Sequence, residues 1–175
     1  MRWQDPLPVT VPPALEAAVG AHPLVSATLA RRGISTPHAA RAFLDPDAYT
    51  PTPPSALPDM DQAVARLAQA LERGERILVW GDFDVDGQTA TTVLVDGLRR
   101  LGGQVAFTIP VRAVDSHGIA PSSLSARLDD GFDLLLTCDT GVAEHEAVSL
   151  ARARGTEVII TDHHELPPPC RTPWR

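Results

Sequence analysis

Acidic and imidazole side chains directly follow three apolar runs of this chain. They are Asp82, Asp84 and Asp86 after residues 77–80, Asp139 after residues 134–138, and Asp162, His163 and His164 after residues 158–161. Carboxylates with imidazoles, and without a thiolate motif, favour Mn²⁺ or Mg²⁺ over a closed structural zinc site. Two such cations about 3.5–4 Å apart can generate hydroxide and hold both oxygens of an in-line displacement at phosphorus. The residue types therefore predict a two-metal site that acts on a phosphate.

Two other uses of the acidic motif fit the sequence poorly. An EF-hand loop also begins D-x-D-x-D-G, but it needs a glutamate at its twelfth position, where Val93 stands here. Aspartyl-phosphate phosphatases place a threonine after the glycine and use a lysine, whereas Gln88 follows Gly87 and the chain has no lysine. The absence of lysine also excludes a lysine-dependent P-loop and a pyridoxal Schiff base.

The individual acids and histidines have different expected positions. A turn at Gly87 would place Asp84 and Asp86 at the start of the following helix, and Asp139 is the natural bridging ligand. Adjacent histidines are expected to point to opposite sides, so that one of the pair ligates and the other faces the substrate.

Three further residues are candidates for binding the phosphate. Arg112 can make a forked contact to a phosphate, although a structural ion pair is an equal alternative. His117 follows the same strand near Arg112. Gly141 leads toward a helix whose N-terminus could receive a phosphate oxygen.

The elements that must position these residues alternate along the chain. Strands are expected at 77–80, 105–109, 134–138 and 158–161, and helices at 59–73, 88–101, 121–130 and 144–154. This alternation predicts an α/β fold, a parallel sheet with helices on both faces. Because the carboxyl ends of parallel strands share one edge, the candidate residues should meet there.

Three regions are expected. Residues 1–58 hold eleven of the seventeen prolines and are predicted to form a proline-rich segment with two small helices within 24–44, packed on the main lobe. Residues 59–165 form that lobe. Residues 166–175 are predicted to be an irregular tail.

Composition bears on the partners and the cellular compartment of the protein. The net charge is −7, but five of the acids lie in the candidate metal motifs, so the charge neither supports nor excludes a nucleic-acid partner. Two cysteines without metal-site spacing, no signal-like N-terminus and no membrane-length apolar run predict a reduced, cytoplasmic protein with no membrane contact.

Three motifs resemble those of the DHH phosphoesterases, and of the N-terminal part of the RecJ-type single-strand-specific DNA exonucleases in particular. They are Gly81-Asp82-Phe83-Asp84-Val85-Asp86-Gly87 (with Phe83 for the commoner tyrosine), Cys138-Asp139-Thr140-Gly141 and Thr161-Asp162-His163-His164. The upstream residues Arg31-Arg32-Gly33-Ile34 and Leu57-Pro58-Asp59-Met60 also resemble the RecJ leader, whereas Ser116-His117-Gly118 departs from the usual Gly-Tyr-Gly.

This resemblance implies a set of roles. The implied metal ligands are Asp84, Asp86, Asp139 and His163, and the implied catalytic residues are His164, which stabilises the transition-state phosphate, and Asp82 beside the ligands. The implied reaction is metal-dependent 5′-to-3′ hydrolysis of single-stranded DNA in recombination and repair. A single-strand-binding protein or a helicase is the implied partner.

The resemblance also implies a further ligand aspartate and a second domain beyond the histidines. The chain ends eleven residues after His164, so it is expected to be truncated and to have little activity alone. Two alternatives stay open: a DHH phosphodiesterase acting on oligonucleotides or cyclic dinucleotides, and a non-catalytic remnant that binds DNA or a partner.

Overall fold

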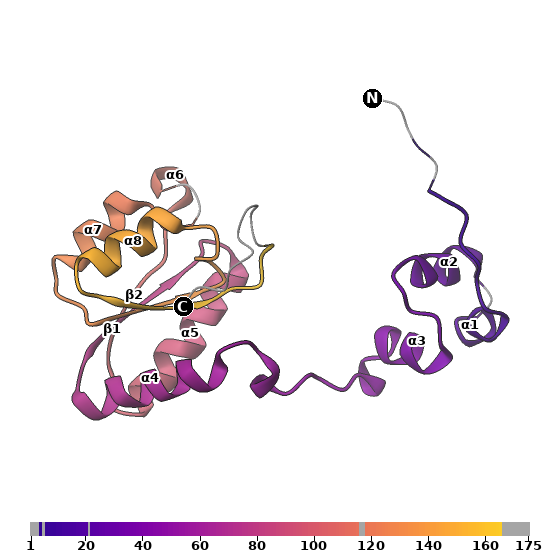
Figure 1. Cartoon of the computed structure of the whole chain (residues 1–175), viewed down its shortest axis with the longest axis horizontal. Helices are drawn as coiled ribbons and strands as arrows, with labels where there is room; N and C mark the ends of the chain where they lie inside the picture. Colours follow the sequence, from indigo (N-terminus) through magenta and orange to yellow (C-terminus); the bar gives the residue numbers. More distant parts are fainter. Residues whose placement is uncertain (1–3, 5, 21, 116–117, 166–175) are drawn as a thin grey trace. The chain divides into compact units, whose positions relative to one another are not determined.

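The computed structural model describes residues 4, 6–20, 22–115 and 118–165 (Figure 1). The expected tail 166–175 and the candidate His117 lie outside the described residues. Internal contacts divide the chain into two compact units, Met1–Leu57 and Pro58–Arg175. None of the helices among the described residues is both long and apolar enough to cross a membrane.

The second unit is built on four parallel strands. They are β1 (Arg76–Gly81), β2 (Gln104–Thr108), β3 (Leu134–Cys138) and β4 (Glu157–Thr161), in the order β2-β1-β3-β4. Every residue of β3 is buried, because this central strand is covered on both faces. The continuous apolar run 134–136 is what such a strand requires.

Helices cover both faces of the sheet, which confirms the predicted fold class (Figure 1). On one face, α4 (Met60–Arg73) and α5 (Val85–Arg100) pack against Ile77 and Val79. On the other, α7 (Pro121–Leu128) and α8 (His145–Ala153) pack against Leu78 and Trp80. Successive side chains of β1 thus pack into the cores on opposite faces of the sheet, because side chains alternate in direction along a strand. A short helix that was not predicted, α6 (Arg112–Asp115), follows β2.

The first unit is a small helical cluster. It contains α1 (Pro13–Ala18), α2 (Pro23–Arg31), α3 (Pro37–Leu44) and the 3₁₀ turns η1 (Pro46–Ala48) and η2 (Pro54–Ala56). Each of the five begins with a proline, whose fixed φ suits the first helical position. Helix α1 was not predicted, because six residues are too few to establish a helical period. Leu15, Leu29 and Ala40 form the core of the unit.

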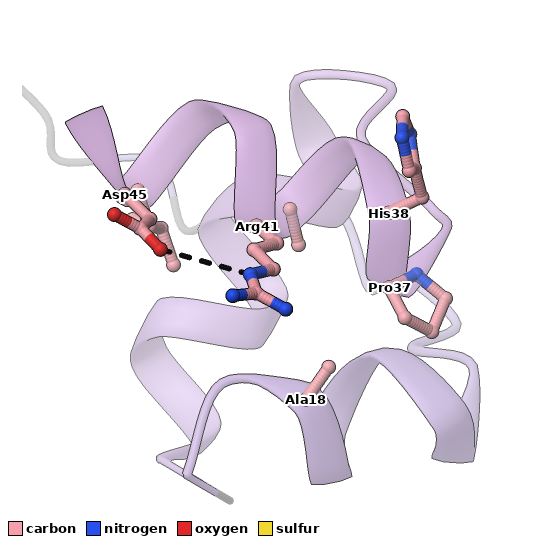
Figure 2. A pocket seen from close by; sticks show the side chains of 7 residues that line it. Ala18, Pro37, His38, Arg41 and Asp45 are labelled. Carbon is pink, nitrogen blue, oxygen red and sulfur yellow. Dashed lines mark ion pairs between the residues drawn. The ribbon is translucent and has the colours of Figure 1, made fainter. Parts of the chain in front are cut away.

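A pocket of about 660 Å³ lies in the first unit (Figure 2). Among its lining residues, Arg41 and Asp45 form an ion pair of 3.6 Å one helical turn apart. The acids and histidines of the three motifs all belong to the second unit, so the pocket holds none of the candidate chemistry.

Candidate metal centre

The three motifs begin at the same level on three neighbouring strands. Gly81 pairs with Cys138, and Cys138 pairs with Thr161. The next residue of each strand is an aspartate: Asp82, Asp139 or Asp162. The chain runs outward from β1 to β2 and, in the opposite direction, from β3 to β4. The motifs of β1 and β3 therefore flank the point where the strand order reverses, which is where open α/β sheets bind ligands.

At the end of β1 the chain turns into α5 earlier than expected. Helix α5 begins at Val85 rather than at Gln88, because Asp84 caps it: its Oδ1 accepts hydrogen bonds from the backbone N–H groups of Asp86 and Gly87, at 3.0 and 3.1 Å. As expected, Asp84 and Asp86 lie at the start of this helix and are exposed. One carboxylate oxygen of Asp84 fixes the backbone while the other is left for a ligand.

At the end of β3 the backbone adopts an uncommon conformation. Asp139 has a φ of 60°, in the left-handed region. The turn is held by a hydrogen bond of 2.7 Å from the Thr137 hydroxyl to the Thr140 carbonyl and by one of 2.9 Å from the Asp139 N–H to the Thr161 carbonyl. These bonds direct the Asp139 side chain, which is only 8 % exposed, toward the motif that follows β4.

Asp162, directly after β4, holds the neighbouring backbone and His164 in place, and the sequence analysis assigned it neither a ligand nor a catalytic role. Its side chain is 3 % exposed, and its Oδ2 accepts from the Val142 N–H at 2.9 Å. Its Oδ1 contacts the N–H and Nδ1 of His164 at 3.1 and 2.7 Å. A carboxylate can only accept, so Nδ1 carries the proton and Nε2 is left free. The position of Asp162 directly after an apolar strand was the available signal.

The expectation that the two histidines point to opposite sides is wrong. The ring centroids of His163 and His164 lie 4.8 Å apart with the rings tilted by 42°. Strand pairing ends at Thr161, so the two-residue alternation no longer applies. The hydrogen bond to Asp162 then turns His164 toward its neighbour.

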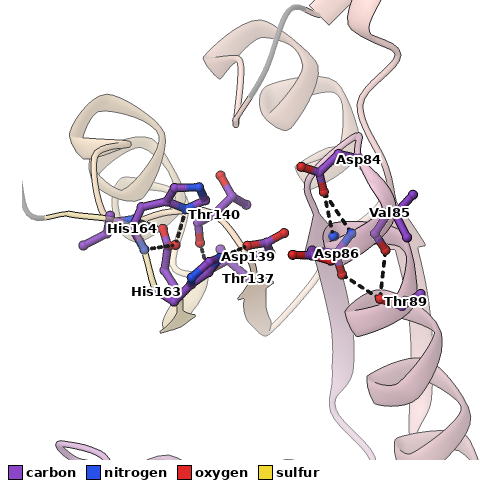
Figure 3. Close-up of polar contacts among 12 residues, drawn as sticks. Asp84, Val85, Asp86, Thr89, Thr137, Asp139, Thr140, His163 and His164 are labelled. Carbon is purple, nitrogen blue, oxygen red and sulfur yellow. Dashed lines mark hydrogen bonds and ion pairs between the residues drawn. The ribbon is translucent and has the colours of Figure 1, made fainter. Parts of the chain in front are cut away.

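Asp139, His163 and His164 converge (Figure 3). Their potential ligand atoms all lie within 4.8 Å of one another. Asp139 Oδ1 is buried and lies 2.8 Å from His163 Nε2, yet it has no partner with hydrogen-bond geometry. Adjacent ligands of an octahedral cation with bonds of about 2.1 Å stand roughly 3 Å apart. The two atoms are therefore spaced as neighbouring ligands of Mg²⁺ or Mn²⁺, and the donor set fits such a cation.

The two sides of the site influence each other electrostatically. Burial is the largest cause that raises the pKa of Asp139, and the nearby carboxylate of Asp84 raises it further, while His163 and His164 oppose the change. The pKa of His164 is also raised, chiefly by its hydrogen bond to Asp162, with minor contributions from Asp139 and Asp82. Figure 3 shows the Asp86 carboxylate directed toward Asp139. The acids beyond β1 thus face the acid and imidazoles beyond β3 and β4.

The other candidate residues have distinct positions. Asp82 is buried and accepts a hydrogen bond from the Gly118 N–H at 3.3 Å. The guanidinium of Arg112 lies 4.5 Å from the centre of the Phe83 ring and so contacts the acidic motif. It forms no ion pair with any acid of the part of the chain that the structure describes. Helix α8 begins at His145, so Gly141 precedes the helix, as expected, and is separated from it by residues 142–144. Gly141 has a φ of 116°, and a Cβ there would lie 2.7 Å from the Thr137 hydroxyl.

Comparisons with known proteins agree with this arrangement. The family model described as "DHH family, N-terminal domain" matches residues 76–174. The single-stranded-DNA-specific exonuclease RecJ of Bacillus subtilis (strain 168) is 39 % identical over 149 residues, which are 83 % of this chain and 19 % of that protein. The chain spans about a fifth of the length of this curated relative.

Solved structures are also similar to this chain. The crystal structure of an exonuclease RecJ bound to manganese has a TM-score of 0.63 and 39 % identity, and the match covers 70 % of this chain and 31 % of that one. The structure of RecJ in complex with Mn²⁺ from Thermus thermophilus has a TM-score of 0.62 and 33 % identity, over 94 % of this chain and 23 % of that one. Both of these relatives were solved with manganese, in agreement with the spacing of the candidate ligand atoms.

Proposed function

This chain belongs to the DHH family, and from that membership we propose that it carries the metal-binding lobe of a single-strand-specific DNA exonuclease. The reaction is hydrolysis of phosphodiester bonds in the 5′-to-3′ direction, dependent on Mn²⁺ or Mg²⁺. The observation that carries the proposal is the convergence of Asp139, His163 and His164 at the switch point of the sheet. The names of the similar proteins support the choice of single-stranded DNA as substrate.

Four side chains would hold the cations: Asp84, Asp86, Asp139 and His163. Asp139 is the bridging candidate, because it lies between the imidazole of His163 and the acids at the start of α5. Cations bound there would supply a hydroxide nucleophile and neutralise charge on the phosphate. The helix cap at Asp84 and the turn around Asp139 hold the carboxylates in place before a cation arrives, which lowers the cost of organising the site.

His164 and Arg112 would act on the substrate itself. Asp162 holds the imidazole of His164 through Nδ1, so that Nε2 remains free to contact a phosphate oxygen. The raised pKa of His164 favours the protonated ring, which stabilises developing negative charge. Arg112, stacked on Phe83 next to Asp84, is placed to make a forked contact to a neighbouring phosphate.

The biological setting belongs to the same proposal. We assign residues 59–165 to the catalytic lobe and residues 1–58 to an accessory segment. We also place the protein in the cytoplasm. There it would act on single-stranded DNA during recombination and repair, with a single-strand-binding protein or a helicase as partner. Since the chain covers 19 % of the curated relative, the activity of a whole exonuclease is part of what must be tested.

Metal binding by the Asp139→Asn variant is the first test. Asparagine has the shape of aspartate and tolerates the left-handed φ of this position, so the backbone is kept while the negative charge and one acceptor oxygen are lost. We expect calorimetric titration to detect Mn²⁺ binding to the unaltered chain and a loss of about tenfold or more in affinity for the variant. Asp96→Asn, the same charge change at an exposed residue of α5 paired with Arg100, is the control. An unaltered chain without Mn²⁺ affinity would contradict the proposal.

Substrate choice is the second test. The same chain is incubated with Mn²⁺ and a 5′-phosphorylated single strand, its duplex, a dinucleotide or a cyclic dinucleotide. Because the chain alone is expected to have little activity, binding is the quantity compared, and we expect the long single strand to bind in preference to the other three. A preference for either dinucleotide would replace the exonuclease with an oligonucleotide phosphodiesterase.

A further inference from the structure

Two side chains of the first motif region hold the backbone of Gly118 from both sides. The Trp80 indole N–H donates to the Gly118 carbonyl at 3.3 Å, and the Gly118 N–H donates to Asp82 Oδ1 at 3.3 Å. Both interactions are buried. Trp80 lies on β1, and Asp82 is the first residue after this strand. The two residues are two positions apart, so both side chains can project to the same face of the sheet. We call this pair of hydrogen bonds the Gly118 clamp.

The backbone conformation of residue 118 and the nearby Glu144 side chain both require a glycine at this position. Gly118 has a φ of 73°, which other residues rarely adopt, and a Cβ there would lie 2.2 Å from Glu144 Oε1. The carboxylate of Glu144, just before α8, therefore lies directly against the Gly118 backbone. Residues from the end of β1 and from the start of α8 thus surround the backbone of Gly118.

The segment that the clamp holds also carries Arg112. This segment connects β2 to α7, and its described part contacts the acidic motif at two neighbouring positions: Gly118 on Asp82 and Arg112 on Phe83. It is tied to α7 as well, because Asp115 accepts hydrogen bonds from the Ser123 hydroxyl at 2.6 Å and the Val111 N–H at 3.0 Å. Gly118 and Arg112 thus belong to one connecting segment, which contacts the first motif at the neighbouring residues Asp82 and Phe83.

Asp82 differs from the other two acids of its motif. Asp84 and Asp86 are exposed at the start of α5, whereas Asp82 is 9 % exposed, and its Oδ1 is used by the Gly118 N–H. A buried acceptor for a backbone N–H fits a residue that positions a chain segment better than one that binds a cation or transfers a proton.

We propose that Asp82 is a positioning residue, which together with Trp80 fixes Gly118 and thereby places Arg112 for the phosphate of the substrate. This inference rests on the proposed function, because it assigns Arg112 to the nucleic acid. It replaces the catalytic role that the sequence suggested for Asp82. Its consequence is that the hydrogen-bond acceptor at residue 82, rather than the negative charge, holds Gly118.

Asparagine and alanine at position 82 separate the acceptor from the charge. Asp82→Asn keeps an acceptor oxygen of the same shape, and Asp82→Ala removes it. Three quantities are measured for each: the exchange rate of the Gly118 amide by NMR, the Mn²⁺ affinity by calorimetry, and the affinity for a 5′-phosphorylated single-stranded oligonucleotide. Asp96→Asn again serves as the control for charge.

The expected pattern is rescue by asparagine. Loss of the acceptor in Asp82→Ala should speed exchange of the Gly118 amide and weaken DNA binding, each by about tenfold, the equivalent of one lost hydrogen bond. Asp82→Asn should stay within about twofold to threefold of the unaltered chain in both quantities. Mn²⁺ affinity should change little in either variant, because neither removes a ligand.

Other outcomes overturn the inference. Loss of Mn²⁺ affinity in Asp82→Asn would make Asp82 a ligand, and unchanged exchange or unchanged DNA affinity in Asp82→Ala would remove its positioning role. If Asp82→Ala does not fold, Trp80→Phe removes the indole donor, together with part of the ring volume at a fully buried position, and should likewise speed exchange of the Gly118 amide and weaken DNA binding. An unaltered chain that binds neither Mn²⁺ nor DNA contradicts the proposed function, while the exchange rate of Gly118 still decides whether the clamp exists.

Discussion

Single side chains at the strand ends do two things at once. Asp84 closes the first turn of α5 with one oxygen and faces the site with the other. Asp162 holds the Val142 N–H with one oxygen and His164 with the other. Because each buried or capping contact fixes a rotamer, these contacts hold the groups of the candidate site in place.

Replacement of Asp162 should release His164. In Asp162→Asn one of the two oxygens becomes an amide donor, so either Val142 or His164 loses its acceptor. We expect the His164 imidazole to become a mixture of Nδ1–H and Nε2–H tautomers, visible in the ¹⁵N shifts of the metal-free protein. Mn²⁺ affinity should fall by roughly tenfold, because Val142 belongs to the turn that carries Asp139. Asp129→Asn, at a surface ion pair with Arg154, is the control, and an unchanged tautomer would contradict the role of Asp162.

Asp115 should make the stability of the second unit depend on pH. The Ser123 hydroxyl, and less strongly the Val111 N–H, lowers the pKa of Asp115 below its ordinary value of 3.8. A lowered folded-state pKa means that the contribution to stability is complete above the unfolded value and disappears as the pH falls through the folded value. Ser123→Ala should therefore reduce the free energy of unfolding at pH 7 and reduce it less below the folded pKa. Urea unfolding at both pH values measures this, and an equal reduction at both would refute it.

At the scale of elements, two glycines let α5 begin immediately beside β1. A Cβ on Gly87 would lie 2.4 Å from the Asp82 carbonyl oxygen, and one on Gly81 would lie 2.0 Å from the Thr91 hydroxyl. The Thr91 hydroxyl in turn donates to the Gly87 carbonyl at 2.7 Å. This close approach, rather than flexibility, explains the glycines that flank the acids, and it brings the capped end of α5 to the edge of the sheet.

Two glycines of the same helix should respond oppositely to alanine. Gly87→Ala places a methyl group against backbone atoms that cannot move without separating α5 from β1, so we expect a loss of about 1–3 kcal/mol in the free energy of unfolding. A Cβ added at Gly97 would have no atom within 4 Å, so Gly97→Ala should add about 0.5–1 kcal/mol through helix propensity. Urea unfolding of both variants compares them, and equal effects would show that packing at Gly87 is not the cause.

At the scale of the whole molecule, the chain consists of two units with separate cores. The first unit has the small cluster of Leu15, Leu29 and Ala40, whereas the second has a core on each face of its sheet. The candidate ligands all belong to the second unit, and so do the residues that hold them in place. Metal binding should therefore depend on the second unit alone.

Damage to the first core should leave metal binding intact. Leu15 is fully buried, and Leu15→Ala should cost about 2–5 kcal/mol through lost burial and a cavity. We expect the unfolding transition of the first unit to shift to lower temperature, while the Mn²⁺ affinity remains that of the unaltered chain. Leu135→Ala, at a fully buried position of β3, should instead abolish Mn²⁺ binding. A parallel loss of Mn²⁺ affinity in Leu15→Ala would show that the units are coupled.

The sequence by itself determined the types of the elements and the chemistry at their ends. The apolar runs at 77–80, 134–138 and 158–161 are strands, and the acids and histidines follow them. The first two runs are buried on both faces of the sheet, which leaves little alternative for them, whereas the third is the half-buried edge strand. The three motifs likewise identified the DHH family, which the comparisons confirmed. Short helices such as α1 and α6 escaped prediction, since they have no period to detect.

Only the tertiary structure decided which of these strand ends meet, and how. The order β2-β1-β3-β4 brings Asp84 and Asp139 to the same reversal point, and strand order depends on long-range packing that no single segment encodes. The contact between the rings of His163 and His164 and the burial of Asp82 under Gly118 also depend on neighbours distant in the chain. Local period and side-chain chemistry are properties of a segment, whereas the geometry of a site is a property of the packed whole.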